Sequence, residues 1–77
     1  MSLLTRAYIL EKYGPRMTLA QLAQLLLMSE GTIRNQISAE TFPIPTYKEG
    51  GGRFAPYEAV ADYLDTRSQE ARLAAHS

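Results

Sequence analysis

Residues 18–39, TLAQLAQLLLMSEGTIRNQISA, decide the fold, because they carry the signals for two short helices and a turn between them. Thr18 and Gln21 match the pattern of a capping box, so the first of these helices is expected to begin at Thr18. The helix breaks at Met28, and Ser29 is expected to cap the next helix by accepting a hydrogen bond from an amide of its first turn. One face of the first helix is apolar at helical spacing, through Leu19, Leu22, Ala23 and Leu26.

The second helix of the pair, expected over residues 30–39, has a narrow apolar seam and a broad polar face. Ile33 and Ile37 lie four residues apart and define its buried side. Gln36 falls between the inner and the outer faces. The residues that point outward are small or polar, so this face offers hydrogen-bonding groups with little bulk: Gly31, Thr32, Arg34, Asn35 and Ser38.

An N-terminal helix is expected over residues 2–13, because Gly14-Pro15 stops the helical pattern there. Leu4 and Tyr8 lie off its main apolar stripe, so the helix is apolar on more than one side. We interpret this as packing within the domain, with a contact between two copies of the chain as the alternative. The main stripe, expected to be buried, comprises Leu3, Ala7 and Leu10, with Tyr13 alongside.

A β-hairpin is expected over residues 44–55. Pro43-Ile44-Pro45 prevents a helix and favours extended chain. Gly50–Gly52 can turn the chain and makes a flexible tip, because glycine loses much conformational freedom on ordering. The two expected strands are Thr46-Tyr47-Lys48 and Arg53-Phe54-Ala55.

A last helix is expected over residues 56–72, because Pro56 suits the first helical position. The residues after it are expected to fray. The whole chain, residues 1–77, is therefore predicted to be a single domain that is mainly α with a small β-hairpin. Its predicted architecture is a winged helix-turn-helix of four helices and a two-stranded wing.

The bulk composition fits one small globular domain. The chain has 77 residues, of which 45% are hydrophobic and 21% charged. It lacks the apolar run of about 18 residues that a membrane-spanning helix needs, and Arg6, Glu11 and Lys12 interrupt the position of a signal peptide's apolar core. It contains no cysteine, which suits a reducing compartment. A cytoplasmic protein without a membrane partner is expected.

Two helices joined by a short turn, the second with an outward polar face, are typical of a unit that reads double-stranded DNA. Arg34 can donate two hydrogen bonds to guanine, and Asn35 can pair with adenine in the same way. The net charge of zero predicts few phosphate contacts and a shallow salt dependence. The candidate DNA-binding residues are Ser29, Glu30, Gly31, Thr32, Arg34, Asn35, Gln36, Ser38, Tyr47, Lys48 and Arg53.

Residues 17–64 resemble the excisionase and MerR-like winged helix-turn-helix families. The resemblance implies sequence-specific binding to duplex DNA, with the second helix of the motif in the major groove and the wing on adjacent backbone. It also implies regulation of transcription or of phage excision. The residues up to Arg16, with EKYGPR, look like the pyocin activator proteins of prophage-like gene clusters. The matching motifs are Leu22-Ala23, Ser29, Thr32-Ile33, Phe42-Pro43-Ile44-Pro45, Tyr47–Phe54 and Asp62-Tyr63-Leu64.

Two positions depart from the family pattern. Leu27 stands where the turn usually has glycine, so either the turn is made differently or the preceding helix runs one residue longer. Gln36 stands where an aromatic residue commonly enters the core, which leaves the helix less firmly anchored and gives Gln36 a possible contact with DNA.

Neither catalysis nor a cofactor is expected. His76 is the only histidine and lies one residue from the end, where it is expected to be disordered. Asp62 and Asp65 are expected to form a solvated face of the last helix, since paired catalytic carboxylates need a cleft that separates their pKa values. A homodimer is expected, because two reading helices would bind two half-sites. The alternative function is a protein-interaction module, for example on RNA polymerase or a recombinase, without direct contact with DNA.

Overall fold

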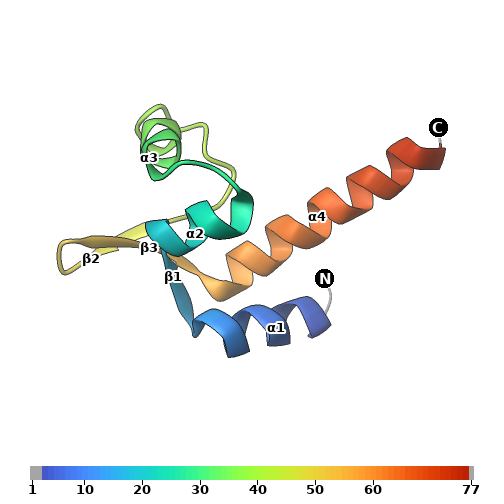
Figure 1. Ribbon diagram of the computed structural model, residues 1–77, viewed down its shortest axis with the longest axis horizontal. Helices are drawn as coiled ribbons and strands as arrows, with labels where there is room; N and C mark the ends of the chain where they lie inside the picture. Colours follow the sequence, from blue (N-terminus) through green and yellow to red (C-terminus); the bar gives the residue numbers. More distant parts are fainter. Residues whose placement is uncertain (1–2, 77) are drawn as a thin grey trace.

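The computed structural model of the protein describes residues 3–76 and is mainly helical, with a small three-stranded antiparallel sheet. The helix α4 is the longest element and projects beyond the rest of the molecule (Figure 1). In chain order the elements are α1 (Leu3–Tyr13), β1 (Arg16–Thr18), α2 (Leu19–Leu26), α3 (Glu30–Ser38), β2 (Tyr47–Glu49), β3 (Gly52–Pro56) and α4 (Tyr57–His76).

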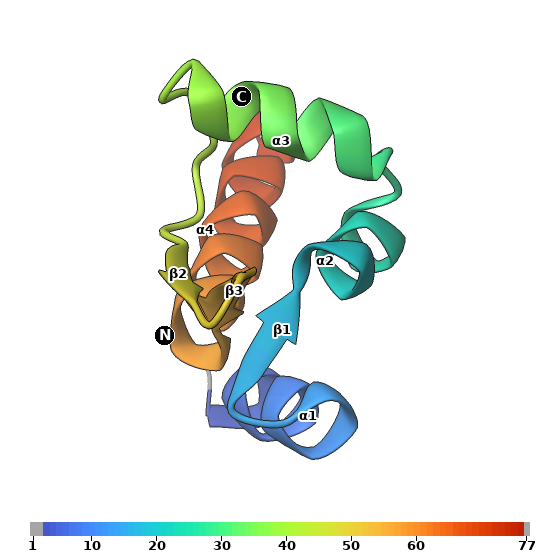
Figure 2. The same cartoon turned by 90° about the vertical axis from the view of Figure 1, so that its left-hand side faces the viewer.

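The sheet has three strands: β2 and β3 form the predicted two-stranded hairpin, and a third strand was not predicted. The additional strand, β1, pairs with β3 and places the sheet between α1 and α2 (Figure 2). Met17 of β1 lies opposite Ala55, and both side chains are buried. A strand of three residues shows too little alternation to be recognised locally. It exists because it pairs with a segment far along the chain.

The boundaries of the last elements also differ from the prediction. Pro56 is the final residue of β3, opposite Arg16, and α4 begins at Tyr57. The Tyr57 amide donates to the Pro15 carbonyl at 3.0 Å, which fixes the start of α4 against the end of the first loop. The helix continues to His76, four residues beyond the predicted end.

The face of α1 that meets the core is not the predicted one. Ile9 is fully buried, whereas 81% of Leu3 and 41% of Leu10 are exposed, and Ala7 is exposed as well. Helical spacing predicted the helix correctly. It could not identify the buried side, because apolar residues occur around most of the helix circumference.

Polar contacts also hold α1 along α4. The Thr5 hydroxyl donates to a carboxylate oxygen of Asp65 at 2.8 Å. Arg6 lies 3.6 Å from the Glu58 carboxylate, measured between a guanidinium nitrogen and a carboxylate oxygen. Both contacts join residues far apart in sequence, so together with Ile9 they fix how α1 lies on α4.

The helices α2 and α3 begin as their sequence signals predict. Thr18 and Gln21 form the full capping box at the start of α2. At α3 the Ser29 hydroxyl accepts a hydrogen bond from the Thr32 amide at 3.0 Å. The turn between them is closed by Leu27, which adopts the left-handed conformation (φ 56°, ψ 44°) usually taken by glycine, so α2 does not run longer.

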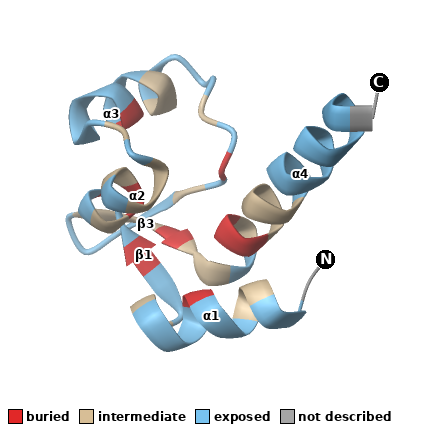
Figure 3. Cartoon of the chain, turned by 45° about the vertical axis from the view of Figure 1, so that its right-hand side comes forward, coloured by how far each residue is buried: buried red, intermediate tan, exposed pale blue. Residues whose placement is uncertain are grey.

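The core lies where the sheet, α1, α2 and α4 meet (Figure 3). It fastens α3 mainly through Ile33, which is fully buried, with Ile37 half-buried beside it as predicted. Gln36 is also half-buried. The buried core residues are Ile9, Met17, Leu19, Leu22, Ile33, Ile44, Ala55 and Val60.

The distal half of α4 lies outside this core. Val60 and Ala61 are buried, but residues 66–75 are all exposed. Of the predicted stripe on this helix, Leu64 packs at the edge of the core, whereas Arg67 and Ala71 face solvent. Across residues 3–76, no helix combines the length and the apolar character required to span a membrane.

Candidate nucleic-acid interface

The outer face of α3 is a nearly continuous exposed surface. Ile33 and Ile37 face inward, and the predicted outward residues all lie on the exposed side: Gly31, Thr32, Arg34, Asn35 and Ser38. Figure 2 shows α3 along one edge of the molecule, above the hairpin formed by β2 and β3. The structure therefore presents α3 and the hairpin on the same end of the protein.

Two of the predicted site residues have defined partners within α3. Ser29 is committed to the helix cap, and its hydroxyl also lies 2.7 Å from the Thr32 hydroxyl. Glu30 accepts a hydrogen bond from the guanidinium of Arg34 at 2.9 Å, one helical turn away. Both partners of this ion pair are substantially exposed, so it contributes little to stability. Its main effect is to lay the Arg34 side chain along the helix.

The strand register separates the side chains of the hairpin into two sets. Lys48 lies opposite Arg53, and strand alternation places both on the side of the sheet that carries buried Ala55. Tyr47 lies opposite Phe54 and therefore on the other side. Tyr47 was predicted to act with Lys48 and Arg53, but the structure does not bring it to their side.

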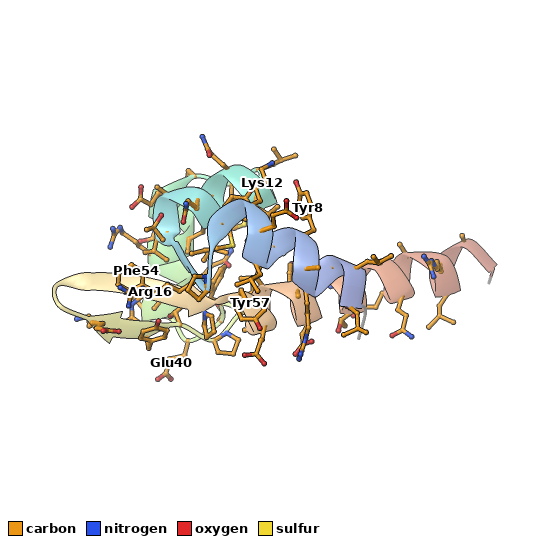
Figure 4. The ribbon with its side chains drawn as sticks, turned by 90° about the horizontal axis from the view of Figure 1, so that it is seen from below. Tyr8, Lys12, Arg16, Glu40, Phe54 and Tyr57 are labelled. Atoms are coloured by element: carbon orange, nitrogen blue, oxygen red, sulfur yellow. The ribbon has the colours of Figure 1, made fainter. Side chains whose placement is uncertain are left out.

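The opposite side of the sheet carries a stacked cluster. The Arg16 guanidinium lies 3.9 Å from the centre of the Phe54 ring. The centres of the Phe54 and Tyr47 rings are 6.0 Å apart. Arg16 also donates to Glu49 at 2.8 Å. A hydrogen bond with Tyr47 and the attraction of Glu49 raise the pKa of Arg16. Figure 4 shows Arg16 beside Phe54 on this side. The carboxylate of the hairpin is thus directed away from Lys48 and Arg53.

A cleft separates α3 from the hairpin, and we name it the basic cleft. Its volume is about 280 Å³, compared with roughly 30 Å³ for one water molecule in the liquid. Three of its lining side chains are cations that come from three different elements, and no carboxylate of residues 3–76 lines it. Its lining residues are Leu19, Arg34, Ile37, Ser38, Lys48 and Arg53.

The cations of the basic cleft are held differently. Arg53 is half-buried and donates to the Thr46 hydroxyl at 2.9 Å, which orients its guanidinium. Arg34 is tethered by Glu30. Lys48 is exposed and makes no ion pair with any residue in the described part of the chain. The cleft therefore combines two oriented guanidinium groups with one exposed ammonium group that forms no ion pair among the described residues.

Sequence reasoning found the cations of this cleft but missed the residues that shape it. Leu19 and Ile37 were assigned only to the core, and Thr46 only to a strand. No local signal links Thr46 to Arg53, because their contact depends on how the chain turns between them. Gln36 does not line the cleft. The backbone carbonyl of Gln36 accepts a hydrogen bond from the Thr41 amide at 2.8 Å, which supports the end of α3.

The two aspartates of α4, Asp62 and Asp65, lie in different surroundings. Asp65 is engaged by Thr5, and Asp62 lies with Pro43 and Tyr63 along a separate groove of about 440 Å³. Among residues 3–76 no group of three His, Cys, Asp or Glu side chains gathers in a way that could hold a metal ion. The backbone of His76, a residue expected to be disordered, belongs to the last turn of α4.

Comparisons of the chain with protein-family models, with curated proteins and with solved structures find no match.

Proposed function

We propose that this protein is a winged helix-turn-helix regulator that binds double-stranded DNA sequence-specifically. In this proposal α3 enters the major groove and the hairpin of β2 and β3 acts as the wing on adjacent backbone. The observation that carries it is the basic cleft, which joins the polar face of α3 to the two cations of the hairpin without an intervening carboxylate. The proposed setting is cytoplasmic, in the control of transcription or of phage excision.

The dimensions of α3 suit the groove. An α-helix with its side chains is about 10–12 Å across, and the major groove of B-DNA is about 12 Å wide. Gly31 and Ser38 leave room for close approach of the helix to the base edges. Asn35 is exposed between them and carries the amide that pairs with adenine in two hydrogen bonds. Asn35 is therefore the proposed reader of one base pair.

A neutral chain is compatible with DNA binding when its charges are separated. Residues 1–56 carry six basic and four acidic side chains, whereas residues 57–77 carry two basic and four acidic ones. On the hairpin, Glu49 is turned to the far side of the sheet and paired with Arg16. The surface that lines the basic cleft is therefore positive. Because the cations there are few, we expect few phosphate contacts and a shallow dependence of binding on salt.

The test is selection of binding sites from random duplexes, followed by titration of the best duplex into isotope-labelled protein. We expect one motif to be enriched and amide shifts to cluster at residues 29–36 and 47–53. Asn35→Ala should relax the preference at one base pair, by about 1–3 kcal/mol. Gln24→Ala, which removes an exposed amide from α2, is the matched control and should change nothing. Absence of any enriched motif, even at low salt, would refute the proposal.

A protein partner is a second candidate function, favoured by the exposed apolar residues of α1. Leu3 and Leu4 are each more than four-fifths exposed, and Ala7, Tyr8 and Leu10 continue the same surface. Exposed apolar patches of this kind mark interaction sites. A second copy of the chain, RNA polymerase or a recombinase is the proposed partner.

The two functions can be separated by substitution. If the chain acts only by protein contacts, Leu4→Asp should abolish its regulatory activity, while alanine at four polar or basic positions of α3 and the hairpin should leave that activity intact. If the chain binds DNA directly, those alanine substitutions should abolish duplex binding. The four positions are Arg34, Asn35, Lys48 and Arg53. Sedimentation of wild type and Leu4→Asp shows whether the α1 surface joins two copies.

A further inference from the structure

We infer that the basic cleft binds a single phosphate group, supplied by the DNA backbone, and that Arg34 is one of its ligands. The inference rests on the proposed function and deepens it. From the sequence, Arg34 was expected to read guanine. Its place on the wall of the cleft, with Lys48 and Arg53, instead assigns it to the backbone and leaves base reading to Asn35.

The first argument is the convergence of donors. Arg34 comes from α3, Lys48 from β2 and Arg53 from β3, and all three line the same cavity. Guanidinium groups match the geometry of phosphate oxygens, and lysine adds a compact charge. Ser38 supplies a neutral hydroxyl to the same wall. A tetrahedral anion in the cleft would therefore meet donors from several directions.

The second argument is the placement of the nearby carboxylates. The cleft wall itself contains none. Glu49 sits beside Lys48 in sequence, but the pleat directs it to the opposite side of the sheet, where Arg16 binds it. Three cations thus line one cavity whose wall includes none of the described carboxylates, and Glu30 pairs with Arg34 from outside it. An anion that enters the cleft reduces the repulsion among them.

The third argument concerns the orientation of Arg34. Its Nη2 atom donates to Glu30, but a guanidinium has five N–H donors, so others remain for a phosphate. Glu30 therefore acts as a positioning residue that holds Arg34 along α3 and does not occupy all of its donors. Arg53 is held in the same manner by Thr46. Two pre-oriented guanidinium groups lose little conformational freedom when the anion binds.

The experiment compares Arg34→Gln, Lys48→Gln and Arg53→Gln with Arg72→Gln, which removes the same charge from the exposed far part of α4. Binding of each full-length variant to the selected duplex and to a scrambled duplex is measured by fluorescence anisotropy over a range of salt. If the replaced residue is a phosphate ligand, its substitution should weaken binding to both duplexes equally. It should also reduce the slope of log affinity against log salt by about 1. A fourfold rise in salt should then weaken such a variant roughly three- to fourfold less than wild type.

A different pattern overturns the inference. If Arg34→Gln weakens only the selected duplex and leaves the salt slope unchanged, Arg34 reads a base. If the cleft variants behave like Arg72→Gln while wild type binds the selected duplex, the cleft holds no phosphate, although the proposed function stands.

A second measurement keeps the two proposals distinguishable. Inorganic phosphate is titrated into the labelled wild-type protein, and the side-chain Nε–Hε signals of Arg34 and Arg53 are followed. Shifts at these signals without duplex binding would support a phosphate site for a free ligand and refute the proposed DNA function. No shifts and no duplex binding would refute both.

Discussion

Replacement of Leu27 by glycine should make the protein more stable, although it removes a large apolar side chain. Leu27 has a positive φ of 56° and is 92% exposed. A left-handed conformation costs a residue with a Cβ roughly 1–2 kcal/mol, and the exposed side chain contributes little packing. Glycine removes this backbone cost, but it also gives the unfolded chain more conformational freedom, which lowers the free energy of unfolding by about 0.4–1 kcal/mol. The net gain should be about 0.5–1 kcal/mol.

The assay is urea unfolding followed by circular dichroism, with the midpoint compared at constant slope. For a domain of this size the gain corresponds to a rise in Tm of about 2–8 °C. Leu27→Ala keeps the backbone cost and should stay within about 0.5 kcal/mol of wild type. Leu26→Gly, one residue earlier in helical and half-buried chain, should destabilise by about 1 kcal/mol or more. The reasoning fails if Leu27→Gly is no more stable than Leu27→Ala.

Three further perturbations test other features. Ser29→Ala should cost about 1 kcal/mol in urea unfolding through loss of the cap of α3, whereas Ser68→Ala, exposed within α4, should cost nothing. Gly51→Ala should destabilise by roughly 1–2 kcal/mol, because its φ is 96°; the added methyl meets no atom within 4 Å, so an unchanged midpoint would exclude this backbone conformation. Tyr8→Phe should lower the pKa of Lys12, which the hydrogen bond to Tyr8 raises foremost, and NMR titration of the Lys12 side chain measures this. Because the pKa of Lys12 is higher in the folded than in the unfolded protein, this hydrogen bond stabilises the fold at pH values below the unfolded pKa. That contribution is lost as the pH rises through the folded pKa. An unaltered pKa of Lys12 in the variant would show that the hydrogen bond is absent in solution.

The elements that could be predicted from the sequence are those whose signals are local. Thr18 and Ser29 cap their helices through amides only three residues away, so both helix starts follow from short motifs. The glycine tip likewise indicates the hairpin. The predicted second helix of the pair ended at Ala39, which is the cap residue after Ser38, a difference of one position.

The elements that could not be predicted depend on distant partners. Met17 becomes part of a strand only because Ala55 lies opposite it. Ile9 becomes the buried residue of α1 because α4 approaches from that side, and the spacing of Leu3 and Leu10 carries no information about this direction.

The candidate site was predictable in part. The sequence identified Arg34, Lys48 and Arg53 as important cations but could not show that they share one cleft. Strand alternation alone places Tyr47 and Lys48 on opposite sides of the sheet. The pairing of Lys48 with Arg53 requires the register, which the turn sets.

The length of α4 has a consequence for how the protein meets a charged surface. The molecule measures 43 × 28 × 17 Å, with the hairpin toward one end of the long axis and the C-terminal turns of α4 at the other (Figure 1). The distal turns of α4 carry Arg67, Glu70 and Arg72, whereas three of the four acidic residues of the helix lie in its first half. Salt screens charges over about 10 Å at 0.1 M, which is about a quarter of the 43 Å long axis. A polyanion at the hairpin end therefore experiences the charges of the hairpin and α3, and those on the distal turns of α4 add little to its attraction.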